Sequence, residues 1–429
     1  MDKLYDVIII GSGVVGNAIA REMSRYNLKI GVLEKELDVC NETSARNSGV
    51  LHAGFNNKPG TLMAKFCVEG NQGFDQVAKE LGVPFKRCGK LVVGFSEEDK
   101  EKLIAMKEQG EKNGVKGLEI IGKDKIKEIE PNIDGEFAMW SKTTGILNPF
   151  LLTIALAENA AANGAEYYFG NEVIDIKRVD DIYNIKTIKD TYKTRWVVNA
   201  AGLYSDKVSK MLGIDDYTIH PCRGEYFILD EKVGSKLSLP AYPVPNPKEG
   251  GLGIHLTPTI DGNVFIGPSS EYIDERDDYS ATQKIMDLLI KDGGRIFPHI
   301  RREEFIRNFA GIRPKLASKE EGGYHDFVIE MRDKSPNTIN LVGIESPGLT
   351  SSTPIAKYVV SLLKQKEELT ENENFNPIRK PIVTFNDKSV EEKEALIKEN
   401  PDYGEVICRC QTITKAEILE AINNPLGVE

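Results

Sequence analysis

Three glycines and one acid near the N-terminus have the types and spacing that can hold a dinucleotide. Gly11, Gly13 and Gly16 form the pattern G-x-G-x-x-G, and Glu34 lies 18 positions after Gly16. In this pattern the first glycine permits a tight turn, the second lets a pyrophosphate approach the backbone, and the third lets a helix pack closely on a strand. The acid can accept hydrogen bonds from ribose hydroxyls and would repel a 2′-phosphate. An unphosphorylated adenosine ribose is therefore expected here.

The elements that would position these residues are a strand, a helix and a second strand. Residues 6–10 are an apolar, β-branched run, which predicts a buried parallel strand. A helical pattern at residues 18–23 follows the glycines, and residues 29–33 predict the strand that ends at Glu34. The free N–H groups and the positive dipole end at the helix start would then face the phosphates. In this context the glycine pattern predicts dinucleotide binding.

Length, charge and cysteine usage narrow the class of protein. The 429 residues are too many for one small core, so two domains are expected. Lys and Arg number 55 against 66 Asp and Glu, a net charge of −11, which argues against nucleic acid or an anionic membrane as the main partner. No apolar run is long enough to span a bilayer, and no secretory signal precedes the first strand. Six scattered cysteines favour a reducing cytoplasm.

Further segments suited to a dinucleotide occur in the middle and near the end of the chain. Residues 196–202 form an apolar strand that ends in small residues and should return to the first sheet. Residues 338–342 form another strand, which runs through a glycine turn into a helix predicted at residues 354–363. A nicotinamide enzyme would keep its site in one contiguous block. A long cofactor held at several points favours a flavin dinucleotide.

Patterns elsewhere in the chain complete the expected layout. Helices are predicted at 62–81, 97–113, 148–163 and 414–422, and strands at 91–94, 166–176, 182–188, 225–229, 253–257 and 263–267. Residues 217–267 are rich in strand signals separated by Pro and Gly, which predicts a mostly antiparallel second domain covering the cofactor. Residues 365–405 are charged, contain scattered Pro and are typical of a linker.

The chain resembles flavoproteins of the D-amino-acid-oxidase superfamily, and most of all the L-2-hydroxyglutarate dehydrogenases and FAD-dependent glycerol-3-phosphate dehydrogenases. The resemblance rests on residues 6–35, 44–54, 197–205, 223–227, 253–268, 311–315 and 341–352. It implies an α/β fold, in which a Rossmann-like FAD-binding domain carries a second, mostly antiparallel β-sheet substrate domain and a short C-terminal appendage. The expected intervals are 1–85, 145–215 and 335–365 for FAD binding, 86–144 and 216–334 for the substrate or cap domain, 366–405 for a linker and 406–429 for the appendage.

The resemblance also assigns cofactor residues. Gly11, Gly13, Gly16, Glu34 and Lys35 would hold the adenosine diphosphate half. The remaining expected contacts are Ser44, Arg46, Asn47 and Ser48 at the pyrophosphate and ribityl chain, Val173 at the adenine, Ala201 and Gly202 beside the cofactor, and Gly343, Gly348, Leu349 and Thr350 at the pyrimidine edge. A helix that begins after Pro347 would favour negative charge on the reduced ring.

Oxidation of an alcohol requires a clamp for the substrate's charge and a base for its hydroxyl proton. Arg313, in Gly-Ile-Arg-Pro, is expected from the resemblance to bind a carboxylate or phosphate, for which a two-pronged guanidinium is suited. His52 or His255 could be the base, since an imidazole titrates near neutrality. Tyr226 could hydrogen-bond the substrate. The resemblance places His52 near the flavin ring.

The C-terminal region contains a second candidate site. Cys408-Arg409-Cys410 precedes a helix-like run with Thr412 or Thr414 as a possible cap. This resembles the start of a bacterioferritin-associated-ferredoxin-like domain, which binds a [2Fe–2S] cluster through a C-x-C pair and a second cysteine pair. No second pair follows here, and two thiolates cannot complete four ligands. Either the chain is a truncated form, or the cluster is absent or shared with a partner, or the thiols are free.

The sequence therefore predicts an FAD-dependent dehydrogenase that oxidises the secondary alcohol of a small anionic metabolite by hydride transfer to flavin N5. Glycerol 3-phosphate is the favoured substrate, and an electron-accepting partner subunit is possible. L-2-hydroxyglutarate is the competing substrate. Two further functions also fit the sequence: an amino-acid or amine oxidase of the same superfamily, and an electron-transfer flavoprotein subunit without its own substrate.

Overall fold

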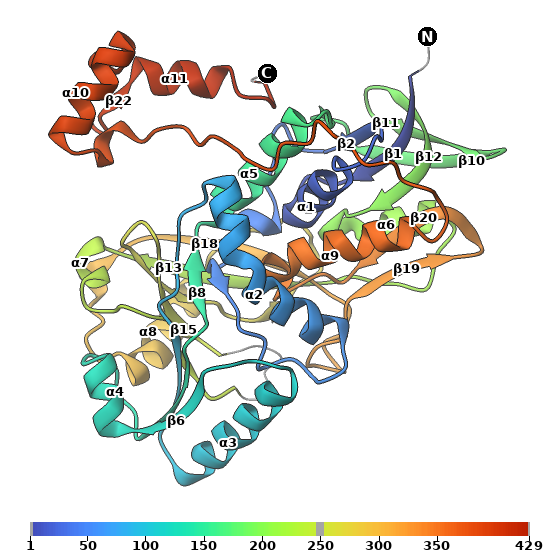
Figure 1. The fold of residues 1–429 in the computed structure, drawn as a ribbon. Coiled ribbons are helices and arrows are strands. Elements are labelled where there is room, and N and C mark those ends of the chain that lie inside the picture. Colours follow the sequence, from blue (N-terminus) through green and yellow to red (C-terminus); the bar gives the residue numbers. More distant parts are fainter. Residues whose placement is uncertain (1–2, 246–252, 428–429) are drawn as a thin grey trace.

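The computed structural model describes residues 3–245 and 253–427 (Figure 1). The stretch 246–252 of the predicted cap domain, residues 1–2 and the last two residues of the predicted appendage lie outside the described residues. Two large sheets dominate the fold, and each carries its own set of helices. A small helical appendage follows them and lies beside the first sheet's helices, with both chain ends on that side (Figure 1). The predicted α/β class is confirmed.

The first sheet has a parallel centre, as the sequence predicts. Its strands are β1 (Leu4–Ile10), β2 (Ile30–Leu33), β9 (Glu166–Tyr168), β10 (Val173–Val179), β11 (Ile182–Thr187), β12 (Thr191–Asn199), β19 (Val328–Arg332) and β20 (Ser335–Val342). The spatial order is β10-β11-β12-β1-β2-β9, and β20 also pairs with β12. β1 is parallel to β2 and β12, and β20 is parallel to β12, so the three dinucleotide segments join one sheet.

Both faces of β1 are buried because its side chains alternate between two packed layers. Val7 and Ile9 pack under α1 (Val14–Met23), α2 (Leu62–Leu81), α5 (Pro149–Ala162) and α9 (Gly348–Leu363). Ile8 and Ile10 pack on the other side, against α6 (Ser205–Met211) and the β10–β11 hairpin. A strand that is buried on both faces has a continuous apolar run, which explains the β-branched sequence of β1.

The second sheet is mostly antiparallel and forms the other half of the molecule. Its strands are β5 (Lys90–Gly94), β6 (Leu118–Gly122), β7 (Phe137–Ser141), β13 (His220–Leu229), β14 (Ala241–Pro243), β15 (His255–Pro258), β16 (Val264–Gly267), β17 (Glu271–Tyr272) and β18 (Phe305–Lys315). The order is β17-β13-β16-β15-β14-β5-β7-β6, with β18 beside β13. Among the described strands of this sheet, only β5 and β14 form a parallel pair. Helices α3 (Glu97–Lys112), α4 (Lys123–Ile129), α7 (Glu231–Gly234) and α8 (Gln283–Ile296) surround it.

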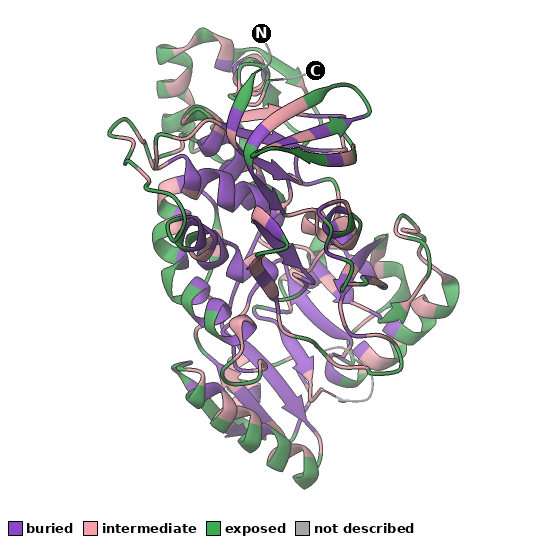
Figure 2. Ribbon diagram, turned by 90° about the vertical axis from the view of Figure 1, so that its right-hand side faces the viewer, coloured by how far each residue is buried: buried purple, intermediate pink, exposed green. Residues whose placement is uncertain are grey.

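Burial follows this arrangement. Figure 2 shows buried strands running through the centre of both halves, whereas α3, at the bottom, exposes its outer face. A third, small sheet of β3 (Val50–Leu51), β8 (Gly145–Leu147) and β4 (Phe85–Lys86) connects the halves. Short 3₁₀ turns occur at Thr43–Ala45, Gly202–Tyr204, Arg302–Glu304, Phe385–Asp387 and Pro401–Gly404. Within the described residues, no helix combines the length and apolar character that crossing a membrane requires.

Two local predictions differ from the structure. The strand expected at 166–176 is two strands, because Gly170 has a φ of +61° and its N–H donates to the Glu36 carbonyl. α9 begins at Gly348, which agrees with a helix start after Pro347 but not with the predicted helix at 354–363, because Pro354 lies inside the helix. A proline there leaves the Thr350 carbonyl without its helical partner. Gly70 of α2 fits against that carbonyl, since a Cβ at Gly70 would stand 2.0 Å from it.

The interval expected as a linker contains ordered structure. Helix α10 (Val390–Glu399) starts at Ser389, whose hydroxyl accepts a hydrogen bond from the Glu392 N–H while the Glu392 carboxylate accepts from the Ser389 N–H in return. The strands β21 (Val406–Cys408) and β22 (Ile413–Thr414) and the helix α11 (Lys415–Ile422) complete the appendage. Thr414 caps α11 by the same reciprocal pattern. Each cap follows the sequence pattern S/T-x-x-E, which predicts a helix start.

Candidate active site between the two sheets

A cavity of about 550 Å³ lies where the first sheet meets the second. From the first sheet it is lined by the segments that follow the carboxyl ends of β1, β12 and β20. From the second it is lined by residues of β13, β15 and β18. Open parallel sheets bind ligands outside the carboxyl ends of their strands, so the position is that of a cofactor site.

The glycine turn after β1 has the close contacts that its pattern predicts. Gly11 has a φ of +103°, and a Cβ there would stand 2.6 Å from the carbonyl oxygen of Ala200. A Cβ on Gly16 would stand 2.0 Å from the carbonyl oxygen of Gly11. Gly13 lines the cavity, where its missing side chain leaves backbone accessible. A side chain at Gly11 would displace the turn after β12, and one at Gly16 would push α1 away from the end of β1.

Two helix N-termini meet at this cavity. The N-cap residues of α1 and α9 are Gly13 and Pro347, and neither provides a side-chain hydrogen bond to its helix. The Ser44 hydroxyl accepts a hydrogen bond of 2.9 Å from the Val14 N–H, so a neighbouring loop serves as partial cap for α1. Gly348 and Leu349, the first residues of α9, line the cavity. The partial positive charges of both helix ends favour an anionic ligand.

Glu34 is held by backbone donors. Its Oε2 accepts from the Ser12 N–H at 2.7 Å and its Oε1 from the Glu36 N–H at 2.9 Å. Burial raises the pKa of this carboxyl, and the two N–H groups counteract that rise. A carboxylate offers about four lone-pair sites, so it can still accept from a ribose. The neighbouring Lys35 pairs with Glu36 and Glu42.

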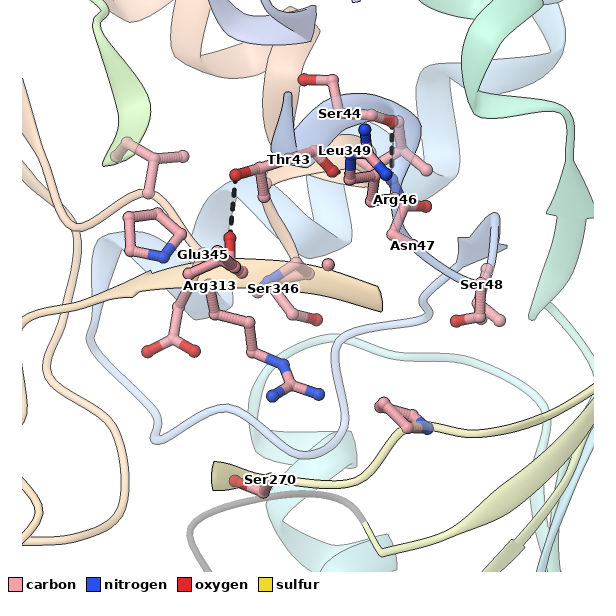
Figure 3. A pocket seen from close by; sticks show the side chains of 18 of the residues that line it. Thr43, Ser44, Arg46, Asn47, Ser48, Ser270, Arg313, Glu345, Ser346 and Leu349 are labelled. Carbon is pink, nitrogen blue, oxygen red and sulfur yellow. Dashed lines mark hydrogen bonds between the residues drawn. The ribbon is translucent and has the colours of Figure 1, made fainter. Parts of the chain in front are cut away.

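The loop after β2 ties the cofactor side of the cavity to β18. The Thr43 hydroxyl donates to the Ile312 carbonyl at 2.9 Å, as Figure 3 shows. A Cβ on Gly311 would stand 2.1 Å from the carbonyl oxygen of Arg46, so only glycine permits this approach. The Arg46 guanidinium lies 4.1 Å from the centre of the Tyr279 ring, and its buried Nε has no described partner. This loop therefore carries a donor available to a ligand.

Arg313 points into the cavity from β18. It faces Cys222 across the β13–β18 pair, and its guanidinium crosses Gly224, where a Cβ would stand 2.6 Å from Nη2. It donates to the Ser269 carbonyl at 3.1 Å and approaches the Cys222 sulfur at 3.7 Å. Figure 3 shows the guanidinium directed towards Ser270, away from the loop at Ser44–Asn47. Among the described residues no carboxylate forms an ion pair with Arg313, so its charge is available to an anion.

One acid that lines the cavity is already neutralised by another cation. Glu345, which lines the cavity, accepts from the Lys315 amino group at 3.2 and 3.3 Å, and both side chains are buried. Burial raises the pKa of Glu345, and the charges of Lys315 and Arg313 lower it. Because Lys315 balances Glu345, this buried pair does not cancel the charge of Arg313.

One ring nitrogen of His255 is hydrogen-bonded, and the other has no described partner. Its Nδ1 lies 2.9 Å from the Gly253 carbonyl, which can only accept, so Nδ1 carries the proton. The Nε2 has no partner among the described residues. Burial lowers the pKa of His255 to about 3, with smaller contributions from the charges of Lys90 and Arg313. A neutral imidazole with a free Nε2 lone pair can accept a proton.

His52 and Tyr226 also line the cavity. The His52 N–H donates to the Thr350 hydroxyl at 3.0 Å, which links the turn after β3 to the start of α9. Burial lowers the pKa of His52 well below its ordinary value, and Lys90 and His255 lower it further. The Tyr226 ring stacks on Phe309 with centres 4.6 Å apart.

The cavity thus gathers most of the residues that the sequence singled out. Lining it are Gly13, Ser44, Arg46, Asn47, Ser48, His52, Gly202, Tyr226, His255, Arg313, Gly348 and Leu349. The other predicted residues do not line it: Gly11, Gly16, Glu34, Lys35, Val173, Ala201, Gly343 and Thr350. Thr350 acts through its hydrogen bond to His52.

Sequence reasoning did not identify several residues of the same site. Tyr242, Tyr324, Glu345, Ser269 and Ser270 line the cavity, and Lys90 lies buried behind its wall. Tyr242 stacks on His255 with ring centres 3.6 Å apart. The available signal was a lysine inside an apolar strand, Lys90 before Leu91-Val92-Val93, where a charge needs a reason.

The cysteine pair forms no comparable centre. Cys408 and Cys410 have sulfurs 3.2 Å apart, on the partly exposed β21 and the turn after it. Across residues 3–245 and 253–427, no group of three or more His, Cys, Asp or Glu side chains could hold a metal ion. The expected cluster therefore has two of its four ligands here, and nothing supports an iron–sulfur centre.

The residues present fit FAD as the group that would occupy this cavity. The glycine turn at Gly13, the uncapped start of α9 and the unpartnered Nε of Arg46 are donors for phosphates and for an electron-rich ring. Glu34 is placed to accept from an adenosine ribose.

Comparisons with known proteins agree with this geometry. Residues 6–362 match the family described as FAD dependent oxidoreductase. The chain is 42% identical over 427 residues to a glycerol 3-phosphate dehydrogenase of Caloramator mitchellensis, covering 99% of this chain and 87% of that protein. It is 30% identical over 416 residues to the mitochondrial L-2-hydroxyglutarate dehydrogenase of Homo sapiens, covering 85% and 90%.

Solved structures give the same result for the fold and the cofactor. The dithionite-reduced L-alpha-glycerophosphate oxidase of Mycoplasma pneumoniae, with FAD bound, matches with a TM-score of 0.82 and 29% identity over 89% of this chain and 100% of that chain. A glycine oxidase of Bacillus cereus, 22% identical over 86% of this chain and 99% of that chain, matches in fold with a TM-score of 0.74. The chain belongs to the FAD-dependent oxidoreductase family, and its relatives support FAD as the cofactor.

Proposed function

We propose that this protein is an FAD-dependent dehydrogenase of glycerol 3-phosphate. The observation that carries the proposal is the guanidinium of Arg313, which projects into the cavity without a described carboxylate partner. Arg313 is half-buried, and a cation that is partly removed from water costs free energy unless an anion joins it. An anionic substrate would supply that partner.

The number of cations in the cavity favours a substrate with one anionic group. Among the described lining residues, Arg46 and Arg313 are the arginines, and no lysine is present. Arg46 belongs to the loop that faces the α1 end, where phosphates of the cofactor would bind. Arg313 alone then remains for the substrate. Glycerol 3-phosphate has one charged group, whereas 2-hydroxyglutarate has two carboxylates and would need a second clamp.

The second requirement is a base. His255 keeps its proton on Nδ1, so its Nε2 can accept the hydroxyl proton of the alcohol. When bound, FAD supplies the acceptor for the hydrogen and the two electrons that leave the alcohol carbon. Arg313 would hold the phosphate and thereby fix the carbon that reacts. His52 lies in the same cavity and is the second candidate for the base.

The relatives support this choice of substrate over its competitors. The Caloramator protein, at 42% identity, and the Mycoplasma oxidase are both named for glycerol phosphate. L-2-hydroxyglutarate remains the second candidate, because several relatives near 30% identity carry that name. An electron-accepting partner protein would complete turnover if oxygen does not.

An anaerobic titration of the FAD-loaded protein tests the proposal. Glycerol 3-phosphate should bleach the visible flavin bands, and glycerol, which lacks the anion, should not. L-2-hydroxyglutarate and small amino acids serve as competing substrates in parallel. Bleaching by L-2-hydroxyglutarate alone would transfer the assignment to the second candidate. If only an amino acid bleaches the flavin, or no small molecule does, the proposed dehydrogenase function is overturned.

A further inference from the structure

A lysine is buried behind the cavity wall, and no described residue neutralises it. The side chain of Lys90, the first residue of β5, is fully buried, and its Nζ has no hydrogen-bond partner among the described residues. No ion pair to a described carboxylate reaches it, in contrast to Lys315, which is equally buried and paired with Glu345. Burial lowers the pKa of Lys90 to about 7. An unpaired buried amine is costly, so its presence calls for a reason other than stability.

The surroundings of Lys90 are two aromatic rings. Its Nζ lies 4.0 Å from the centre of the Tyr242 ring and 4.6 Å from that of Phe55. The Tyr242 ring also stacks on the imidazole of His255, with centres 3.6 Å apart and planes 11° from parallel. Two groups at these distances cannot share one face of the ring without colliding. Lys90 and His255 therefore lie on opposite faces of Tyr242.

Three neighbouring strands create this stack. β14 lies between β5 and β15. Its Ala241 is opposite Leu91 of β5 on one side and Leu256 of β15 on the other. Those three residues face the second sheet's own core. Strand alternation then places their neighbours Lys90, Tyr242 and His255 on the opposite face, towards the cavity.

Within the described part of the chain, the other groups that face this wall do not supply a negative charge. They are Cys67 from α2, His52 from the turn after β3, Tyr226 from β13 and Arg313 from β18. Burial raises the pKa of the Cys67 thiol to about 12, so this thiol stays neutral. Arg313 adds a second positive charge. A proton on His255 would thus create two cations on opposite faces of one buried ring, with a third nearby.

We propose that Lys90 is a positioning residue that must be uncharged before His255 can accept a proton. Lys90 then sets the lowest pH at which the cavity can deprotonate an alcohol. The effect of Lys90 on the reaction rate rests on the proposed function. The coupling of Lys90 with His255 through Tyr242 does not, because it is a property of the chain itself. In this reaction the alcohol proton moves to Nε2 of His255, while the amino group of Lys90 has already released its own proton to solvent.

Two substitutions of Lys90 should have opposite effects. Lys90→Met removes the charge and suits an aromatic, apolar site; Lys90→Arg keeps a charge at every accessible pH. With a pKa of about 7 for Lys90, flavin reduction in the wild type at pH 6 should run at about a tenth of its plateau rate. The Met variant should lack this decline at low pH, and the Arg variant should be slow throughout. If the rate of flavin reduction by Lys90→Met declines at low pH as it does in the wild type, the proposal is overturned.

A readout independent of turnover separates this inference from the proposed function. Without cofactor or substrate, ¹⁵N NMR of histidine rings should show His255 titrating at higher pH in Lys90→Met than in the wild type, with His255→Gln assigning the signal. An unshifted His255 would contradict the coupling. If the shift appears but no alcohol bleaches the wild-type flavin, the proposed function fails and the coupling stands.

Stability supplies the last check, because a purely structural lysine should destabilise the fold when it is removed. Lys90→Met should instead melt at a higher temperature than the wild type below pH 7, where burial of the charged amine costs most. Between pH 7 and 10.5 the unfolded chain binds the proton that the folded chain has released, so wild-type stability rises with pH. The advantage of Lys90→Met should shrink over that range. A lower melting temperature at every pH would show a structural role.

Discussion

The two ends of the cavity are built by different means. The end near α1 depends mainly on backbone: Gly11, Gly13 and Gly16 lie within six residues, and their missing side chains permit its close contacts. The other end consists of side chains, among them Arg313 from β18 and His255 from β15, whose strands are not neighbours in the sheet. A site made from local backbone can be recognised in the sequence. A site made from distant side chains depends on the register of a sheet.

The largest effect should come from the backbone end. Gly16→Ala would place a Cβ 2.0 Å from the Gly11 carbonyl oxygen, so α1 must move away from β1. We expect protein without bound FAD, measured as the ratio of flavin to protein absorbance after purification. Gly73→Ala is the matched control, because Gly73 lies within α2 with nothing inside 4 Å of the added Cβ. That control should retain FAD and gain up to about 1 kcal/mol of stability.

At the side-chain end the base should matter most. His255→Gln keeps the size of the side chain but removes the Nε2 lone pair that faces the cavity. We expect the rate of flavin reduction by glycerol 3-phosphate to fall by about 10²–10⁴, with little change in the concentration needed for half-saturation. His52→Gln provides the comparison. If the loss occurs in that variant and His255→Gln reacts normally, His52 is the base.

Arg313 should control binding more than chemistry. Arg313→Met removes the charge while leaving β18 paired with β13. We expect the apparent affinity for glycerol 3-phosphate to fall by about 10²–10³, the range for removing one partner of a buried charge pair. Bound FAD should be unchanged, because Arg313 points away from the Ser44–Asn47 loop (Figure 3). Loss of FAD together with substrate affinity would mean that the two ends are not separable.

Glu34 tests whether the backbone end has a side-chain component. Glu34→Gln puts an amide nitrogen opposite either the Ser12 or the Glu36 N–H, so one backbone donor loses its acceptor. A lost buried hydrogen bond costs about 1–3 kcal/mol, and we expect FAD to bind about tenfold more weakly. Titration of the flavin-free protein with FAD measures this effect. Unchanged affinity would show that backbone alone forms this end.

The same contrast explains what could be predicted from the sequence. β1, the glycine turn and the full length of α2 follow from local patterns, since apolar periodicity and glycine spacing act within a few residues. The sequence also predicts that β12 returns to the first sheet, and β20 repeats the strand and small-residue turn of β1. Local patterns do not predict features that depend on contacts between distant residues. Pro354 is an example: it lies inside α9, where Gly70 of α2 packs against the Thr350 carbonyl that the proline leaves without a helical partner.

The candidate site divides in the same way. Sequence motifs point to Arg313 and His255 but not to Tyr242 and Lys90, whose roles arise only when β5, β14 and β15 lie side by side. The sequence also does not show that Lys90 lacks an ion-pair partner among the described residues. Lys315 likewise lies in a strand, but it is paired with Glu345. Whether a buried lysine is paired depends on residues that the fold brings together from distant parts of the chain.

The appendage should have the smallest effect on the cavity. Together with the ordered segment before it, from residue 384, the appendage has a short core of its own in Phe385, Tyr403 and Ala416, and none of its described residues lines the cavity. Removal of residues 384–429 should leave FAD content and dye-coupled turnover within about twofold of the full chain, as for changes remote from a site. The segment before it differs, because Arg379 donates to the Leu81 carbonyl and Arg21 donates to that of Pro377. Cutting at residue 366 should therefore destabilise the helices that cover the first sheet. A loss of activity already at 384 would assign the cysteine-bearing appendage a part in the reaction.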